Sequence, residues 1–250
     1  MVLEVLIMSK IRKQYFARLF GRIAIFIACL IMCFKSDFYN ILNGMNFFSE
    51  FHILHLLWII WMFDMILQII PMKNDVALGS QKLWANRFKP VGEKKYYKAL
   101  KAFTRKSTSG AYIVFIIWTL LIAILGILYH FEIINEVWLF MISVCFYVCD
   151  LICVLIWCPF RLIMKNKCCT TCRIFNWDHL MMFSPLIFVG GFFSLSLVIT
   201  AIIAWLIWEI VVLIHPERFC EITNDALKCI NCTDKLCTQY CEKRKKKNSE

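Results

Sequence analysis

The fold depends most on the apolar run Leu180–Ile214, LMMFSPLIFVGGFFSLSLVITAIIAWLIWEIVVLI, in which Glu209 is the one charged residue. As a single helix it would be about 50 Å long at ~1.5 Å per residue, whereas the hydrocarbon core of a bilayer is ~30 Å thick. Gly190, Gly191, Ser194 and Ser196 lie near its middle. We therefore expect a helical hairpin that turns near these small residues, with one long tilted helix as the alternative.

The rest of the chain has the same apolar character. Of its 250 residues, 61% are hydrophobic, and the mean hydropathy is +0.68. Soluble domains are only about 45–50% apolar, so this composition indicates a membrane protein. We expect an all-α bundle at 1–215 and a Cys-rich, basic tail at 216–250. The expected spans are about 16–34, 52–72, 111–131, 137–163, 180–195 and 197–214.

Charge placement predicts the topology. The net charge is +11, and the basic residues gather in the N-terminal segment, the connections at 73–105 and 161–173, and the tail. Six spans with both termini in the cytoplasm place all of these segments inside, as the positive-inside rule requires. This pattern predicts a multi-pass protein of the cell membrane and no nucleic-acid partner. Arg18 and Arg22 interrupt the first span, and we expect them to snorkel to the interface.

The connection at 73–105 also predicts a lipid contact. Lys94–Lys106 places aromatic and aliphatic residues between lysines at near-helical spacing. Such a segment is typical of an amphipathic helix that lies on an anionic inner leaflet, although a solvated basic loop has the same composition. The lipid bilayer is therefore the expected partner.

Most of the 14 cysteines lie in the last part of the chain, some at Cys-x-x-Cys spacing. This spacing is typical of metal or redox sites, and the reducing cytosol makes a disulfide framework unexpected. Four tail thiolates would complete a zinc site or an iron–sulfur cluster, with free thiols or lipidation as the alternatives. The predicted ligands are Cys168, Cys169, Cys172, Cys229, Cys232, Cys237 and Cys241, and further ligands would be Cys158, Cys220, His179 and His215.

Cys153 and the Cys158-Pro159 pair end the fourth expected span, and cysteine clusters follow. Together with Cys229–Cys241, this arrangement resembles the membrane polyferredoxins that assist periplasmic nitrate reduction and cytochrome-oxidase assembly. The resemblance implies iron–sulfur clusters that pass electrons to a membrane redox partner. The tail spaces its cysteines by two, four and three residues, where the family's ferredoxin run uses two, two and three.

Polar residues inside the expected spans form a second candidate site. Asp64 and Gln68 lie one helical turn apart in the second span, and Asp150 lies in the fourth. A carboxylate at this depth is costly and usually faces the bundle interior or a water path. These residues predict a proton or cation site, or an interhelical hydrogen bond. Glu209, near the inner interface, needs no special account.

Histidines mark the outer ends of the spans. His52 and His55 share a face at the start of the second span, and His130 ends the third on the same side. They predict an outer metal site or haem ligands, or simply histidines that tolerate an interface.

Three functions follow from these features. The first is electron transfer or redox sensing through a cytoplasmic iron–sulfur centre. The second is a zinc-stapled protein of transport or assembly that uses Asp64 and Asp150. The third is a membrane enzyme that acts on lipids, with the basic connection holding the headgroups.

Overall fold

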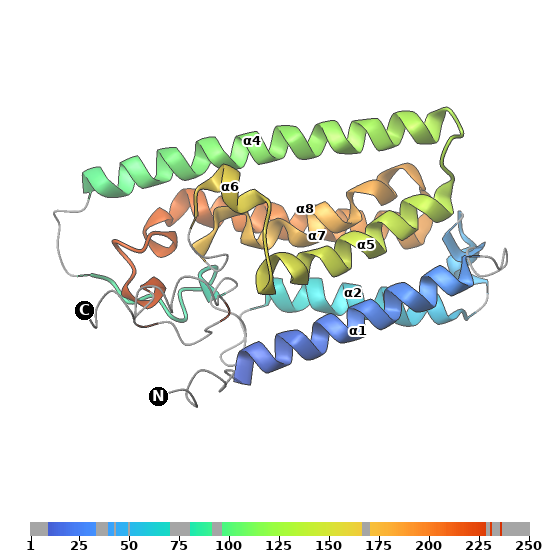
Figure 1. Cartoon of the computed structure of the whole chain (residues 1–250), viewed down its shortest axis with the longest axis horizontal. Coiled ribbons are helices and arrows are strands. Elements are labelled where there is room, and N and C mark those ends of the chain that lie inside the picture. The colour runs from blue at the N-terminus through green and yellow to red at the C-terminus, as the bar shows by residue number, and fades with distance from the viewer. Residues whose placement is uncertain are drawn as a thin grey trace.

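The structure is a computed structural model, and it describes residues 10–33, 40–42, 44–49, 51–70, 81–91, 97–166, 171–228, 231 and 236. These residues form an antiparallel helical bundle without a β-strand, which confirms the all-α prediction for the described ranges (Figure 1). The α-helices are α1 (Lys10–Met32), α2 (Ile53–Ile69), α4 (Tyr97–His130), α5 (Glu136–Leu155), α6 (Phe160–Met164), α7 (Asp178–Phe183) and α8 (Gly191–Ile214). The 3₁₀ helices are η3 (Asn46–Phe48), η6 (Arg173–Trp177), η7 (Ser184–Phe188), η8 (Pro216–Phe219) and η9 (Asp225–Leu227).

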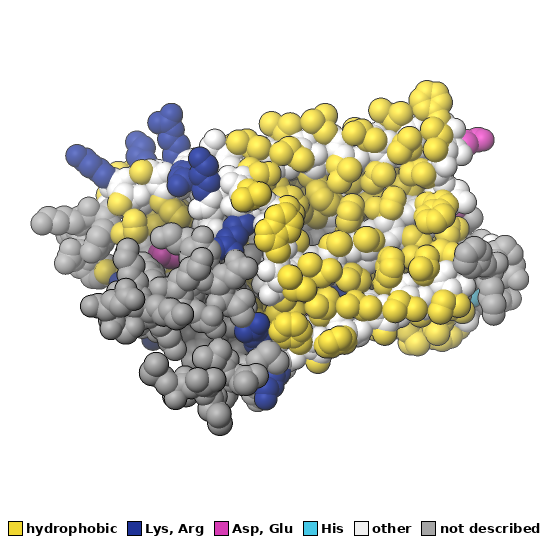
Figure 2. Space-filling view, viewed as in Figure 1, with side chains coloured by type: hydrophobic (Ala, Val, Ile, Leu, Met, Phe, Trp, Pro, Cys, Tyr) yellow, Lys and Arg dark blue, Asp and Glu magenta, His cyan; other side chains and the backbone are white. Residues whose placement is uncertain are grey.

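Within the described residues, four helices are long and apolar enough to cross a membrane: α1 (from Ile11), α4, α5 and α8, with 22, 34, 20 and 24 residues. The apolar helix α2 is shorter, at 17 residues. Many large apolar side chains on these helices are exposed, and Figure 2 shows them as an apolar belt across the face in view. An apolar surface of this extent is unfavourable in water and suits a bilayer.

The expected turn in Leu180–Ile214 is made by Gly190 and Gly191. Their φ angles are 72° and 68°, a left-handed conformation that glycine adopts at little cost. A Cβ atom on Gly191 would lie 2.5 Å from the carbonyl oxygen of Leu42, so a side chain there would collide with the α1–α2 connection. The Phe192 N–H donates to the Gly44 carbonyl at 3.1 Å. As a result the turn docks on that connection, and α8 begins at Gly191 rather than at residue 197.

The segment before this turn is not a regular α-helix. It consists of η6, α7 and η7 in direct succession, with a non-helical residue at Asn176. We call it the Arg173–Phe188 arm. Rises of ~1.5 Å per α-helical residue and ~2.0 Å per 3₁₀ residue give it a length of about 30 Å. Its far end packs on α4, where a Cβ atom on Gly126 would lie 2.5 Å from the Phe188 ring.

One end of the bundle is basic. α1 and α4 begin there, and α5 and α8 end there (Figure 1). Lys and Arg side chains gather at this end, outside the apolar belt (Figure 2). Helix α4 has 34 residues, which is about 51 Å at ~1.5 Å per residue, so its first turns extend beyond a ~30 Å hydrocarbon core. From Tyr97 onward, the segment expected to form a separate amphipathic helix is therefore part of α4.

The described part of the tail packs on the bundle. The Arg218 guanidinium donates to the Leu83 carbonyl at 3.1 Å, and Asn224 forms an isolated antiparallel β-bridge with Pro90. Leu236 is buried in a cluster that also contains Leu19. The described part of the tail is therefore anchored by contacts that involve no metal ligand.

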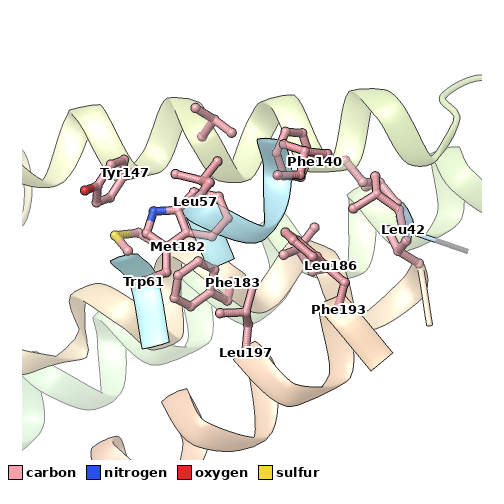
Figure 3. Close-up of a cluster of buried hydrophobic side chains, with 14 of the residues drawn as sticks. Leu42, Leu57, Trp61, Phe140, Tyr147, Met182, Phe183, Leu186, Phe193 and Leu197 are labelled. Atoms are coloured by element: carbon pink, nitrogen blue, oxygen red, sulfur yellow. The ribbon is translucent and has the colours of Figure 1, made fainter. Parts of the chain in front are cut away.

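The core of the bundle places the polar residues that follow. Trp61 of α2 is fully buried, with its ring 5.6 Å from Tyr147 of α5 and 5.0 Å from Phe183 of α7 (Figure 3). Asp64, Asp150 and His179 each lie one helical turn closer to the basic end than Trp61, Tyr147 and Phe183, respectively. Because residues three or four apart share a helix face, packing of the aromatic layer aligns a polar layer beside it.

Candidate functional site

Arg22 of α1 is buried in the bundle, with 7% of its surface exposed. Its Nη1 donates to Asp150 Oδ2 at 2.6 Å and to the Tyr147 carbonyl at 2.7 Å. The guanidinium also lies over the Tyr147 ring, 4.0 Å from its centroid. The expectation that Arg22 snorkels to the interface is therefore wrong, because a carboxylate on α5 binds it inside.

Asp64 continues this network to α2 and α7. Its Oδ2 lies 3.7 Å from Arg22 Nη2 and 3.6 Å from His179 Nε2. On the other side of the imidazole, His179 Nδ1 lies 3.3 Å from Asp178 Oδ1. Gln68 donates to Asp178 Oδ2 at 3.2 Å. The members of this polar cluster are Arg22, Asp64, Gln68, Asp150, Asp178 and His179.

The polar cluster carries more acid than base. Asp64, Asp150 and Asp178 provide three carboxyl groups, whereas Arg22 and His179 provide at most two positive charges. His179 is almost fully buried, with 2% of its side chain exposed. Within the described part of the chain, its ring nitrogens form no hydrogen bond of standard geometry. Outside the cluster, the exposed Arg18, one turn before Arg22, adds a positive charge near Asp64. Among the buried groups themselves, three acids share two bases, an arrangement that can take up a proton or a cation.

A cavity of about 240 Å³ adjoins the polar cluster, between α4, α5, α6 and the Arg173–Phe188 arm. Asp150 and Asp178 both line it. The rest of its wall is largely apolar and includes the rings of Trp118, Phe146 and Phe160. A few converging polar groups in an apolar cavity are typical of ligand sites.

Cysteines line another part of this cavity wall. Cys158 and Cys172, both predicted as metal ligands, lie there with Cys149 and Cys153. Cys172 is buried, and this burial raises the pKa of its thiol, so the neutral form is favoured. In the described ranges, no group of three or more His, Cys, Asp or Glu side chains is arranged to hold a metal ion.

The structure does not describe six of the other predicted cysteine ligands. Cys168, Cys169, Cys229, Cys232, Cys237 and Cys241 lie outside the described residues. Iron–sulfur or zinc binding by the tail therefore stays a prediction, which metal analysis of the purified chain would test.

Two other predicted metal ligands, His215 and Cys220, lie apart from the cavity. His215 Nδ1 is 3.0 Å from Glu217 Oε1, just beyond the end of α8. Cys220 is buried, and its carbonyl accepts a hydrogen bond from the Asn224 N–H at 2.9 Å. His179, predicted as a further metal ligand, instead lies in the polar cluster between two carboxyl groups.

At the end of the bundle opposite the basic end, His55 takes part in the capping of α2. The His52 N–H donates to His55 Nδ1 at 2.9 Å, so the proton of the His55 ring is on Nε2, which donates to the Phe47 carbonyl at 2.8 Å. His130 lies at the end of α4, with its ring 5.7 Å from that of Phe131. These contacts give His52 and His55 a place in the helix start without a metal.

A second buried ion pair joins the Arg173–Phe188 arm to α8. Arg173 Nη2 lies 2.5 Å from Glu209 Oε2, and Trp177 Nε1 donates to the other oxygen of Glu209 at 2.8 Å. Arg173 also donates to Thr108 Oγ1 at 2.6 Å, and its carbonyl accepts from Trp208 Nε1 at 2.7 Å. Glu209 thus has a structural partner, which the sequence alone did not indicate.

Sequence reasoning found Asp64, Gln68 and Asp150 but missed what joins them. Asp178 was not singled out, His179 was predicted as a further metal ligand, and Arg22 was assigned to the interface. A signal was present for Arg22, because a guanidinium inside an apolar run requires an acidic partner, and Asp150 lies inside another apolar run.

The chain matches no protein-family model, no curated protein and no solved structure.

Proposed function

We propose that this chain is a six-span membrane transport protein that moves protons or a small cation, with the polar cluster as its exchange site. The observation that carries the proposal is the geometry of three carboxyl groups around Arg22 and His179. Asp150 is 2.6 Å from Arg22, and Asp64 is within 3.7 Å of both bases. Buried ionisable groups with excess acid inside apolar helices are typical of proton and ion pathways.

The six spans of this proposal are α1, α2, α4, α5, the Arg173–Phe188 arm and α8. The arm counts as a span because its length of about 30 Å equals that of the hydrocarbon core. An even number of spans agrees with the shared position of the start of α1 and the end of α8 (Figure 1). The basic end of the bundle then faces the cytoplasm by the positive-inside rule.

Contacts within the polar cluster suggest a route for exchange. Asp64 is the most exposed carboxyl group, with 36% of its side chain accessible, and His179 links it to Asp178. Asp178 lines the cavity, so a proton that passes along Asp64, His179 and Asp178 reaches that space. Arg22 keeps its charge throughout, because a guanidinium does not release its proton in proteins. Its role is to hold Asp150 ionised until a cation or proton competes for it.

Flux measurements in liposomes test this function. The purified chain is reconstituted with a pH-sensitive dye inside, and proton and potassium fluxes are measured under an imposed gradient. We expect Asp64→Asn and Asp150→Asn to reduce the flux at least tenfold, since each removes an exchangeable charge. Asp225→Asn is the matched control, because this carboxylate lies outside the bundle and pairs with Lys228 at 2.7 Å.

The control should keep the wild-type rate. The proposal is wrong if the proton and potassium fluxes of the wild-type protein both equal those of protein-free liposomes. It is equally wrong if Asp64→Asn and Asp150→Asn, folded as judged by circular dichroism, both transport at the rate of the Asp225→Asn protein.

A further inference from the structure

A groove of about 680 Å³ lies at the basic end of the bundle, between the first turns of α4 and helix α6. Among the described residues, its lining contains five cations and no acidic residue. The cations are Lys98, Lys101, Arg105, Lys106 and Lys165. Figure 2 shows Lys and Arg side chains projecting at this end, beyond the apolar belt.

Two elements bring these charges together. Gly110 of α4 lets α6 approach closely, because a Cβ atom there would lie 3.0 Å from Met164 Sδ and 3.5 Å from Met164 Cα. Helix α6 then ends at Met164, and Lys165 follows it in a left-handed conformation with a φ of 49°. The groove is therefore a recess between α4 and α6, and Lys165 lies across it from the cations of α4.

The cations are available to bind an anion. All five are exposed, and none of them forms an ion pair with a described acidic residue. Like charges gathered in one recess repel one another, and a bound anion removes this repulsion. A guanidinium and several ammonium groups are also the side chains that bind phosphate oxygens best.

The position of the groove points to a lipid. Its cationic residues occupy the part of α4 that extends beyond the apolar run, whereas Ile113 and Ile163 line its other side. The apolar run of α4 continues from Ala111 to the end of the helix. A molecule in this groove thus contacts cations at the level of the headgroups and an apolar surface on the side of the hydrocarbon core. These two surfaces match the charged headgroup and the acyl chains of a phospholipid.

We infer that this groove binds a phospholipid whose headgroup carries at least one phosphomonoester, such as a phosphorylated inositol lipid. The phosphates contact the lysines and Arg105, and the acyl chains lie along the apolar face of α4 beside Ile113. A headgroup with several charges fits better than a singly charged one, because five cations converge on one recess. This inference does not depend on the proposed transport function.

Binding of a fluorescent short-chain phosphatidylinositol bisphosphate to the full chain in neutral detergent–lipid micelles tests the inference. We expect saturable binding that weakens at least tenfold in the Lys101→Gln/Arg105→Gln protein. The matched control is Lys13→Gln/Lys89→Gln, which removes two exposed cations outside the groove and should change the affinity less than twofold. Because all four residues are exposed, both double variants should fold, which circular dichroism checks.

Two competitors identify the occupant. Unlabelled phosphatidylinositol bisphosphate should displace the probe, whereas phosphatidylserine at matched total charge should displace it at least tenfold less effectively. Equal loss of binding in both double variants would mean general charge attraction and overturn the groove as a site. Displacement by soluble inositol trisphosphate as effective as that by the lipid would overturn the assignment to a lipid.

Discussion

Arg22 and Arg173 are both buried, and the contrast between their surroundings separates the proposed exchange site from a structural contact. Arg173 and Glu209 pair one to one, and both oxygens of Glu209 are bonded at 2.5 and 2.8 Å. Arg22 shares two carboxyl groups at 2.6 and 3.7 Å, within a cluster that has an excess of acid. The first arrangement leaves no capacity for another charge. In the second, a proton or a cation can compete with Arg22 for a carboxyl group, as the proposed function requires.

The largest effect on stability is expected from Glu209→Leu. This change leaves Arg173 buried without its charge partner and Trp177 Nε1 without its acceptor. Since a guanidinium cannot become neutral, the free energy of unfolding should fall by about 3–5 kcal/mol. Unfolding by sodium dodecyl sulfate in mixed micelles, followed by far-UV circular dichroism, measures it.

The conservative change Glu209→Gln is the control for that experiment. It keeps an acceptor for Trp177 but removes the charge, so its loss should be smaller than that of Glu209→Leu. If Glu209→Leu unfolds at the wild-type midpoint, the Arg173–Glu209 pair is not the structural contact described above.

A smaller loss is expected from Arg22→Leu, although Arg22 is as deeply buried as Arg173. Its orphaned carboxyl groups can each bind a proton and become neutral, so we expect a loss of about 1–3 kcal/mol. Adding Asp150→Leu should restore at least half of it, because an apolar pair replaces an unpaired acid. The same unfolding titration measures both proteins. Strictly additive losses in the double variant would show that Arg22 and Asp150 do not interact.

The smallest effects should come from the neutral partners of each network. Gln68→Leu removes the 3.2 Å bond to Asp178, and Thr108→Val removes the 2.6 Å bond to Arg173. Each should cost about 1 kcal/mol, with the larger loss for Thr108→Val, whose bond is shorter. Gln68→Leu should also alter proton flux, whereas Thr108→Val should not. The reverse result would show that exchange takes place at the Arg173–Glu209 contact and not in the polar cluster.

The sequence predicted features that lie within a single helix, but it did not predict features that depend on how two helices pack. Apolar runs predicted α1, α4, α5 and α8, and the glycine pair predicted the turn before α8. The Arg173–Phe188 arm was not foreseen as a mixture of 3₁₀ and α-helix, because 3₁₀ turns lack the 3.6-residue period. Asp64 and Asp150 were recognised by the cost of burying a charge.

The pairing of those acids could not be predicted in the same way. It depends on the rotation of α1, α2, α5 and α7 about their axes, which the packing around Trp61 determines. No pattern within a single helix specifies that His179 lies between Asp64 and Asp178. The metal prediction for the tail concerns residues outside the described ranges and stays open to metal analysis.

Helix α6 has a consequence for the whole molecule because it separates two spaces. Phe160 and Arg161 line the cavity beside the polar cluster, whereas Ile163 and Lys165 line the basic groove. A displacement of this five-residue helix changes the shape of both spaces at once. If lipid in the groove and a cation in the cavity prefer different positions of α6, their affinities are thermodynamically linked, and each ligand changes the affinity of the other by the same factor. Membrane composition would then act as an allosteric effector of the exchange site.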